Sequence, residues 1–409
     1  MRHDDQHLFC KQEEEMNERN NNESRNGGRN ENAAVDMVAT AQAVQQAGDA
    51  WRGPGAVKLI APAKVNLFLG IGARREDGYH EAVSILHAIA LHDVLYLRRA
   101  AGRPSAGEVG AQAAAAAGTS VPRGTAGASA ARDAAGTSAA RDAAGTSDAA
   151  DDATALAGPA HNVSVRMECI AREGLAPLPV AASENIVFRA IDALAHEVGR
   201  TEPDFLEVRL EKHIPHQAGL GGGSSDAAAA LLGMARLWEI GPDDPALERV
   251  AHRLGSDVAF FLQGGCACFE GTGERFAHAL EPMKRSLVLV RPVKGVSTAE
   301  AYRMFDEAPL PIDEGCLQQA KQAACASDVP LFNNLASASE RLMPELDEVK
   351  AWLQSQPGVE GVLLCGSGST TFAVVNGVNE ACRLTAAAQA RGWWARSTTF
   401  GSLRAAIVP

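Results

Sequence analysis

The chain has 409 residues, of which 46% are hydrophobic and 22% are charged, so it contains enough apolar material to bury a large core. Its formal net charge is −12, from 38 Lys and Arg against 50 Asp and Glu, which argues against nucleic acid or an anionic membrane as a partner. No stretch approaches the ~18 consecutive apolar residues of a membrane-spanning helix. We therefore expect a soluble globular protein with no nucleic-acid partner and no membrane partner.

The eight cysteines are irregularly spaced, with no C-x-x-C pair and no histidine at zinc-binding spacing. An even number of cysteines is typical of disulfide-linked secreted domains, but those chains are usually short. The length of this chain and the lack of a signal-peptide pattern favour free thiols and a cytoplasmic location.

Two segments have compositions that do not support a packed core. Residues 1–54 are polar and include 10 acidic residues, which predicts a disordered N-terminal extension and is too acidic for a transit peptide. Residues 100–160 contain 25 alanines and carry the unit AARDAAGTS twice, at 130–138 and 139–147. Nine residues without a large apolar side chain cannot stack as a solenoid, so we interpret this segment as a low-complexity insertion.

The first half of the remaining chain mixes the two periodicities. Residues 57–71 alternate as a strand, and Ser183 is a candidate N-cap for a helix that runs to Leu194. Residues 206–210 alternate as a second strand and lead through a glycine cluster into a strong helix at 226–238. Residues 246–262 are predicted to form two helical pieces with a break near Gly255.

The last third predicts strands near 287–290, 362–365, 371–375, 393–399 and 404–408, with a helix near 378–390. Strands and helices mix without a regular βαβ repeat, which favours an α+β fold in two packed lobes. We expect an N-terminal domain at 55–290, interrupted by the insertion, and a C-terminal α+β domain at 291–409.

The most informative stretch is a glycine-rich loop that joins a predicted strand to the strong helix. Four glycines in five positions let a backbone approach an anion closely, and the helix N-terminus adds partial positive charge. Its two serines offer hydroxyls for a phosphate oxygen or a magnesium ion. A flexible linker is the plain alternative, but a linker would not run from a strand directly into a good helix. The predicted phosphate-binding residues are Pro215, His216, Gln217, Ala218, Gly219, Leu220, Gly221, Gly222, Gly223, Ser224 and Ser225.

Other phosphate loops do not match this pattern. No lysine follows the glycines, so it is not a Walker loop, and the dinucleotide fingerprint and the protein-kinase motifs are also absent. Residues 215–225 resemble instead the Pro-x-x-x-Gly-Leu-Gly-Ser-Ser motif of small-molecule kinases such as galactokinase, homoserine kinase and mevalonate kinase, with two extra glycines.

Within this group of kinases, four stretches of the sequence resemble one family in particular, the kinases that act on 4-diphosphocytidyl-2-C-methyl-D-erythritol. They are the glycine loop, APAKVNL followed by RREDGYH at 61–80, LGSDVAFF at 254–261, and GSGST at 366–370. The four occur in the family's order, and the resemblance covers roughly residues 56–99 and 161–409. The N-terminal extension and the alanine-rich insertion lie outside the family pattern.

The resemblance implies a two-lobe kinase fold with the ATP and substrate sites between the lobes. It also implies that ATP, with Mg²⁺, phosphorylates the 2-hydroxyl of the cytidine-diphosphate-linked substrate in the non-mevalonate isoprenoid route. Asp257 would be the catalytic base and Lys64 would lie beside it, which favours the ionised carboxylate. The plain alternative is that Asp257 only caps a helix that starts after Gly255. Asn185 would approach the adenine or simply begin its helix.

The same resemblance predicts five residues that bind the substrate. Asn66, Tyr79 and His80 would hold it, because an aromatic ring and an imidazole suit a cytosine. Thr298 and Tyr302, spaced i and i+4, would close the pocket from one helix face. Alternatively, Tyr79 and His80 belong to an ordinary turn, and Thr298 and Tyr302 serve only packing.

Several questions stay open at this level. The same fold acting on another alcohol, such as homoserine or a mevalonate derivative, is the nearest rival, and a non-catalytic nucleotide-binding regulator is a second. His87 and His92 lack a third ligand, so we expect no metal held by a set of protein side chains. We expect a monomer or a homodimer.

Overall fold

The computed structural model describes residues 51, 53, 55–76, 78–100, 155–157, 163–180 and 184–409. The predicted disorder of 1–54 and the low-complexity character of 100–160 therefore concern segments that lie, apart from a few residues, outside the described part. Gly55–Pro409 is one compact unit and is described by itself. None of the described helices is long and apolar enough to span a membrane.

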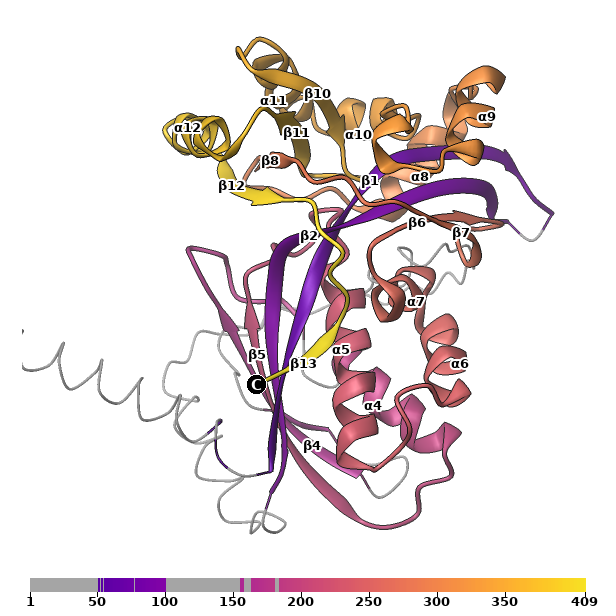
Figure 1. Ribbon diagram of the computed structural model, residues 1–409, viewed down its shortest axis with the longest axis vertical. Coiled ribbons are helices and arrows are strands. Elements are labelled where there is room, and N and C mark those ends of the chain that lie inside the picture. The colour runs from indigo at the N-terminus through magenta and orange to yellow at the C-terminus, as the bar shows by residue number, and fades with distance from the viewer. Residues whose placement is uncertain are drawn as a thin grey trace, which may run out of the picture. The chain divides into compact units, whose positions relative to one another are not determined.

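One sheet is built around two unusually long strands, β1 (Ala56–Arg74) and β2 (His80–Arg99) (Figure 1). Its main strand order is β13-β1-β2-β5-β4-β3, and all of these pairs are antiparallel except β4 with β5. The β6–β7 pair joins β2, and the short β9 joins β1. The bounds of these other strands are β3 Ala155–Ala157, β4 Val163–Ala171, β5 Asp204–Lys212, β6 Cys266–Glu270, β7 Arg275–Leu280, β9 Phe332–Asn333 and β13 Ala406–Val408.

The two long strands have different neighbours at their two ends. β5 pairs with residues 94–99 of β2, whereas β6 pairs with residues 84–87 of the same strand. The β1–β2 register shifts between Pro62 and Ala63. Such irregularities bend a strand and redirect its side chains. Lys64 follows this shift directly.

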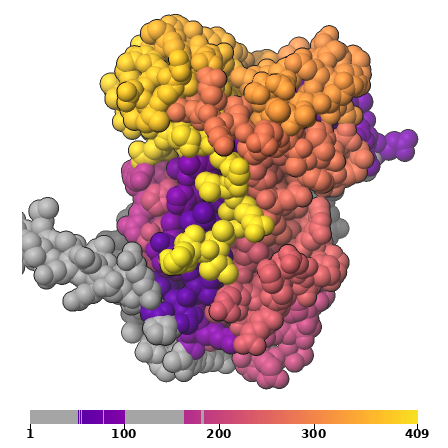
Figure 2. Space-filling view, viewed as in Figure 1, coloured from indigo at the N-terminus to yellow at the C-terminus, as the bar shows by residue number. Residues whose placement is uncertain are grey.

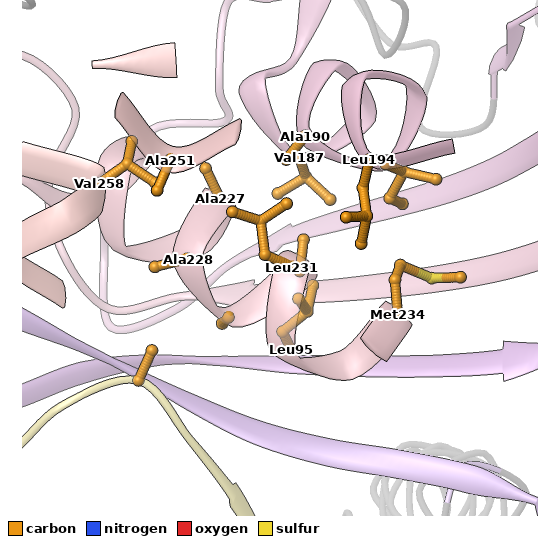
Figure 3. Packing of buried hydrophobic residues seen from close by; sticks show 14 of the residues in the cluster. Leu95, Val187, Ala190, Leu194, Ala227, Ala228, Leu231, Met234, Ala251 and Val258 are labelled. Atoms are coloured by element: carbon orange, nitrogen blue, oxygen red, sulfur yellow. The ribbon is translucent and has the colours of Figure 1, made fainter. Parts of the chain in front are cut away.

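Helices α4 (Ile186–Glu197), α5 (Gly222–Leu237), α6 (Pro245–Leu254) and α7 (Ser256–Gln263) pack with this sheet around one apolar core. Figure 3 shows side chains of all four helices meeting, with Leu95 of β2 among them. The four alanines at 227–230 are fully buried, so their small size lets α5 lie close to the strands. At Gly233 an added Cβ would lie 2.2 Å from Leu97, which shows how tight this contact is.

The second sheet has the order β10-β11-β8-β12, and every pair in it is antiparallel. Its strands are β8 Ser286–Arg291, β10 Val359–Leu364, β11 Thr371–Val375 and β12 Trp394–Thr399. Helices α11 (Glu345–Gln354) and α12 (Val378–Gln389) share an apolar cluster with it. The remaining helices are α8 Thr298–Glu307, α9 Glu314–Gln322, η3 Ala326–Asp328 and α10 Ala336–Leu342.

The chain returns to the first sheet at its end. β13 pairs with β1 at residues 58–60, and in Figure 2 this yellow segment lies beside the indigo strands. The last strands of the sequence therefore contribute to both sheets, β12 to the second and β13 to the first.

The α+β mixture expected from the sequence is confirmed, and so is the break between two helical pieces at Gly255. The predicted cap Ser183 lies outside the described residues, and Asn185 caps α4 instead by accepting a 2.9 Å hydrogen bond from the Val187 N–H. Seven cysteines fall in the described residues and all are free thiols, as expected.

Candidate active site

The glycine-rich loop leads into the N-terminus of α5, and two of its glycines are required by geometry. Gly221 is the N-cap, with a φ of 71° and no side-chain cap, and a Cβ there would lie 2.9 Å from Phe261. At Gly219 (φ 76°) a Cβ would lie 2.1 Å from the carbonyl oxygen of Cys365. The first intrahelical hydrogen bond runs from Ser225 N to Gly221 O, so the preceding N–H groups have no acceptor within the helix.

Backbone hydrogen bonds hold the loop from two sides. Lys64 N donates to Leu220 O at 3.0 Å, which ties the loop to β1. Thr370 N donates to Ala218 O at 3.1 Å, which ties it to the second glycine-rich stretch, 366–370. Backbone contacts to two other segments therefore set the shape of the loop.

A buried arginine holds the same loop from the second sheet. The Arg291 guanidinium, at the end of β8, donates to the carbonyl oxygens of His216, Pro292 and Val293 at 2.9, 3.0 and 3.1 Å. Burial lowers the pKa of Arg291 to about 10, so it remains charged at neutral pH. Burial, together with Lys212 and Arg291, lowers the pKa of His216, which is therefore neutral there.

Lys64 and Asp257 meet beside this loop. Lys64 Nζ lies 3.6 Å from Asp257 Oδ2, and the Lys64 side chain is 6% exposed against 26% for Asp257. Asp257 lies in the first turn of α7, where the helix N-terminus favours a carboxylate. The N-cap of that helix is Gly255, so the alternative in which Asp257 serves as the cap is wrong.

A side-chain relay orients Lys64 and reaches the second glycine-rich stretch. Lys64 Nζ donates to Asn66 Oδ1 at 2.8 Å, and Asn66 Nδ2 donates to Ser84 Oγ at 3.0 Å. A Cβ placed on Gly366 would lie 3.5 Å from Asn66 Oδ1 and 3.9 Å from Lys64 Nζ. The glycine loop, the Lys64–Asp257 pair and Gly366 therefore border one location.

Thr298 lies beside the same second glycine-rich stretch. Its Oγ1 is 2.8 Å from Ser367 Oγ, and Ser339 Oγ donates to the Ser367 carbonyl oxygen at 2.8 Å. Asn333 Nδ2 donates to the Gly366 carbonyl oxygen at 2.7 Å. These contacts hold Gly366 and Ser367 in addition to the backbone bond that ties Thr370 to the glycine-rich loop.

His80 and Tyr302, which are far apart in sequence, pack together. Their ring centroids are 5.9 Å apart, and Tyr302 lies on the same helix, α8, as Thr298. His80 Nδ1 contacts the Gly72 carbonyl oxygen at 3.0 Å, and Nε2 contacts Asp306 Oδ1 at 2.9 Å. Both ring nitrogens thus face oxygen acceptors, which fixes the ring.

Tyr79 lies in the turn that precedes His80. Its carbonyl oxygen accepts a 2.6 Å hydrogen bond from Arg75 N, so the turn interpretation of this segment is correct for its backbone. The same turn delivers His80 to the start of β2.

The structure adds residues that sequence reasoning missed: Ser84, Arg291, Asn333, Ser339 and Asp306. None belongs to a contiguous motif, and each acts through a contact over at least 18 positions in sequence, so no local signal pointed to them.

Among the residues that the structure describes, there is no group of three or more metal-ligating side chains. A hollow of about 530 Å³ contains none of the predicted site residues, and it is lined by His92, His213, Arg396 and residues of α12 and β12.

Comparison with known proteins agrees with the geometry. The descriptions "GHMP kinases N terminal domain" and "GHMP kinases C terminal" match residues 185–265 and 312–391. The 4-diphosphocytidyl-2-C-methyl-D-erythritol kinase of Desulfitobacterium hafniense is 31% identical over 334 residues, which cover 81% of this chain and 91% of that protein. The same-named kinase of a Nocardioides species is 32% identical over 337 residues, covering 80% of this chain and 91% of that protein.

Solved structures give the same result. A crystal structure of 4-(cytidine 5'-diphospho)-2C-methyl-D-erythritol kinase has a TM-score of 0.57 at 27% identity, covering 84% of this chain and 99% of that chain. A crystal structure of mevalonate kinase has a TM-score of 0.53 at 11% identity, covering 84% and 99%, and it supports the fold alone.

A glycine loop at a helix N-terminus, a lysine–aspartate pair and this two-sheet fold define an ATP-dependent small-molecule kinase of the GHMP class. Within that class, the chain belongs to the 4-diphosphocytidyl-2-C-methyl-D-erythritol kinase family.

Proposed function

We propose that this chain transfers the γ-phosphoryl group of ATP to the 2-hydroxyl of 4-diphosphocytidyl-2-C-methyl-D-erythritol, a step of the non-mevalonate isoprenoid route. The observation that carries the proposal is the Lys64–Asp257 pair, 3.6 Å apart, beside a glycine loop that Lys64 itself anchors through its backbone N–H. Two relatives that align with 81% and 80% of this chain carry the name of that kinase.

The glycine loop is the proposed ATP site. Unpaired N–H groups at the start of α5 and the partial positive charge of the helix N-terminus suit phosphate oxygens. Ser225 Oγ is buried without a hydrogen-bond partner among the described residues, as expected of a hydroxyl reserved for a ligand. Residues 215–225 would thus bind and orient the nucleotide, which is most of what phosphoryl transfer requires.

Asp257 is the proposed base for the acceptor hydroxyl. Its partly exposed carboxylate can reach a bound alcohol, and the buried Lys64 ammonium lies 3.6 Å from it. Lys64 would also stabilise negative charge that develops on the attacking oxygen. Asn66 holds Lys64 in this position through its 2.8 Å hydrogen bond.

Mg²⁺ is part of the proposal as the ion that accompanies ATP. It typically keeps several waters and binds phosphate oxygens with few protein ligands, which fits a site where the described residues contain no cluster of three metal-ligating side chains. When bound, the ion would neutralise charge on the phosphates.

The acceptor pocket is proposed to lie along Asn66, Tyr79, His80, Thr298 and Tyr302. His80 and Tyr302 present adjacent rings, which suit stacking with a cytosine. The two ring nitrogens of His80 are already engaged, so we assign His80 a stacking and shaping role rather than a hydrogen bond from its ring edge.

The proposal extends to the organisation of the chain. We place a nucleotide-binding and catalytic domain at 55–290 and a second domain at 291–409; this boundary falls at the end of β8 (Ser286–Arg291), which is already a strand of the second sheet. We also propose a cytoplasmic enzyme without a nucleic-acid partner, either a monomer or a homodimer. The seven free cysteines of the described residues support the cytoplasmic location, and the net charge of −12 argues against a nucleic-acid partner.

ADP release by the purified chain tests the proposal. The assay supplies ATP and Mg²⁺ and compares the cytidine-diphosphate-linked methylerythritol with homoserine, mevalonate and galactose at equal concentration. We expect turnover confined to the cytidyl substrate. Turnover of another alcohol would overturn the acceptor pocket, and ATP binding without turnover of any of the four would overturn the assignment as a kinase of these alcohols.

A further inference from the structure

Three charged side chains form a buried cluster beneath the phosphate loop. They are Asp93 of β2, Lys212 at the end of β5 and Asp226 in the first turns of α5, exposed by 0%, 6% and 2%. Lys212 Nζ donates to Asp93 Oδ2 and, at 2.6 Å, to Asp226 Oδ2. None of the three belongs to the predicted catalytic or ligand-binding set.

The two carboxylates have different surroundings. Asp93 Oδ1 accepts the backbone N–H groups of His213 at 2.5 Å and Ile214 at 2.8 Å, so Asp93 receives three donors over its two oxygens. Asp93 therefore acts only as an acceptor, and one of its three donors is the Lys212 ammonium, with which it forms an ion pair. Asp226 accepts only from Lys212, and its Oδ1 is buried with no partner among the described residues.

The charge balance of the cluster requires one more proton. Two ionised carboxylates and one ammonium would leave a net negative charge in a buried place, which is costly. Burial raises the pKa of Asp226 well above its ordinary value; Lys212 opposes this rise and Asp93 adds to it. Burial alone would lower the pKa of Lys212, but its two carboxylate partners outweigh burial and raise it, so Lys212 stays charged.

The neighbouring titratable groups do not supply the missing positive charge. On β4, burial raises the pKa of Cys169 to about 12, so its thiol is neutral. The pKa of His216 is lowered by burial and by the nearby cations, so its ring is neutral too. His213 meets the cluster through its backbone N–H, while its ring lies 3.4 Å from Glu173.

We propose that the Asp93–Lys212 ion pair positions the phosphate loop, and that Asp226 completes the cluster as a neutral carboxylic acid. Asp93 fixes the backbone at His213 and Ile214, where the chain enters the loop. Lys212 reaches the exit of the loop, since a Cβ on Gly222 would lie 3.3 Å from its Nζ. Asp93 thus holds the entry of the loop directly, and Lys212 links it to Asp226, which follows the loop in α5; all three side chains are positioning residues.

Two isosteric substitutions separate the roles of the carboxylates. Asp226→Asn replaces a neutral acid by a neutral amide, which still offers Lys212 an oxygen, so we expect the ATP dissociation constant to stay within about twofold. In Asp93→Asn, one side-chain oxygen remains for the three donors that share two oxygens in the wild type. The amide group that replaces the other oxygen can only donate, so it would face another donor, either Lys212 or a backbone N–H. We expect this substitution to weaken ATP binding about tenfold or more, because a buried donor is left without an acceptor.

Calorimetric titration with ATP measures these constants without an acceptor, and Glu248→Gln, an exposed position on α6, is the control. The inference rests on the proposed ATP site, and the two can fail separately. A wild-type chain that does not bind ATP would contradict the site, whereas binding that Asp93→Asn leaves unchanged, or that both substitutions weaken equally, would contradict the cluster's role.

Infrared spectroscopy tests Asp226 even if Asp93→Asn does not fold. A protonated buried carboxylic acid has its own carbonyl band, which we expect in the wild-type spectrum at neutral pH and not in that of Asp226→Asn. Identical spectra in that region, or unfolding of Asp226→Asn under conditions where the wild type is folded, would overturn the neutral-acid assignment.

Discussion

The two halves of the proposed active site are built differently. At the proposed phosphate end, residues 215–225 form one continuous stretch, a loop that passes into the first turn of α5, and backbone hydrogen bonds hold it from β1 and from 366–370. At the proposed acceptor end, His80 of β2 meets Tyr302 and Asp306 of α8 through side-chain contacts. Phosphate chemistry is common to many kinases and needs a fixed backbone, whereas an acceptor pocket gains its selectivity from side chains that can be exchanged.

The pair that joins the two halves should have the largest effect. Replacing Asp257 by Asn removes the proposed base while keeping the shape, so kcat should fall by roughly 10²–10⁴-fold with little change in the KM for ATP. Steady-state kinetics measures both constants. Asp243→Asn, an exposed carboxylate in the turn after α5, is the control and should be unaffected. A kcat within threefold of the wild type would remove Asp257 from the mechanism.

Lys64→Met should rank next. It removes a buried cation that lies 3.6 Å from Asp257 and leaves Asn66 without its donor, so we expect a loss of about 10²–10³-fold in kcat. Lys58→Met, on the same strand but distant from the site, is the matched control. If both substitutions lowered kcat equally, the loss would come from strand β1 and not from charge at the active site.

Gly219→Ala tests the rigidity of the phosphate end. Its Cβ would lie 2.1 Å from the Cys365 carbonyl oxygen at a φ of 76°, and overpacking together with a left-handed alanine costs ~1–3 kcal/mol. We expect a rise of about tenfold or more in the KM for ATP and a lower melting temperature. Gly241→Ala, where a Cβ meets nothing within 4 Å, should change neither value. An unaltered KM for ATP in a folded Gly219→Ala would show that the loop is not a fixed cradle.

Asp306→Ala should have the smallest effect and should act only on the acceptor end. It frees His80 Nε2 from its 2.9 Å contact, and the partial exposure of Asp306 limits the loss, so we expect a rise of about fivefold to tenfold in the KM for the cytidyl substrate. The KM for ATP should stay constant. Glu307→Ala, the exposed next residue on α8, is the control. A rise in the KM for ATP of equal size would erase the distinction between the two ends.

The sequence predicts the contiguous parts of this molecule well. The glycine loop and the helix α5 follow from glycine spacing and an alanine run, and the break between α6 and α7 follows from Gly255. The structure also brings Lys64 and Asp257 together, as the family resemblance implies.

What the sequence does not reveal depends on contacts between distant segments. β1 is buried on both faces around residues 63–71, so its alternation carries little information there. Asp306 and Arg291 are polar residues without a local pattern, and their roles follow only from His80 and from the His216 carbonyl oxygen, which the fold brings to them. Asn185 begins its helix, as one of the two interpretations of the sequence holds, and the bond that shows this joins its side chain to the Val187 N–H.

The most direct test of the central claim is the position of the phosphoryl group in the product. Phosphorus NMR of the reaction with ATP, Mg²⁺ and the cytidine-diphosphate-linked methylerythritol should show one new phosphate monoester, on the 2-hydroxyl, for each ADP formed. Asp257→Asn should form neither product at a comparable rate. Release of inorganic phosphate instead, or a monoester at another hydroxyl, would contradict the proposed alignment of loop, base and acceptor.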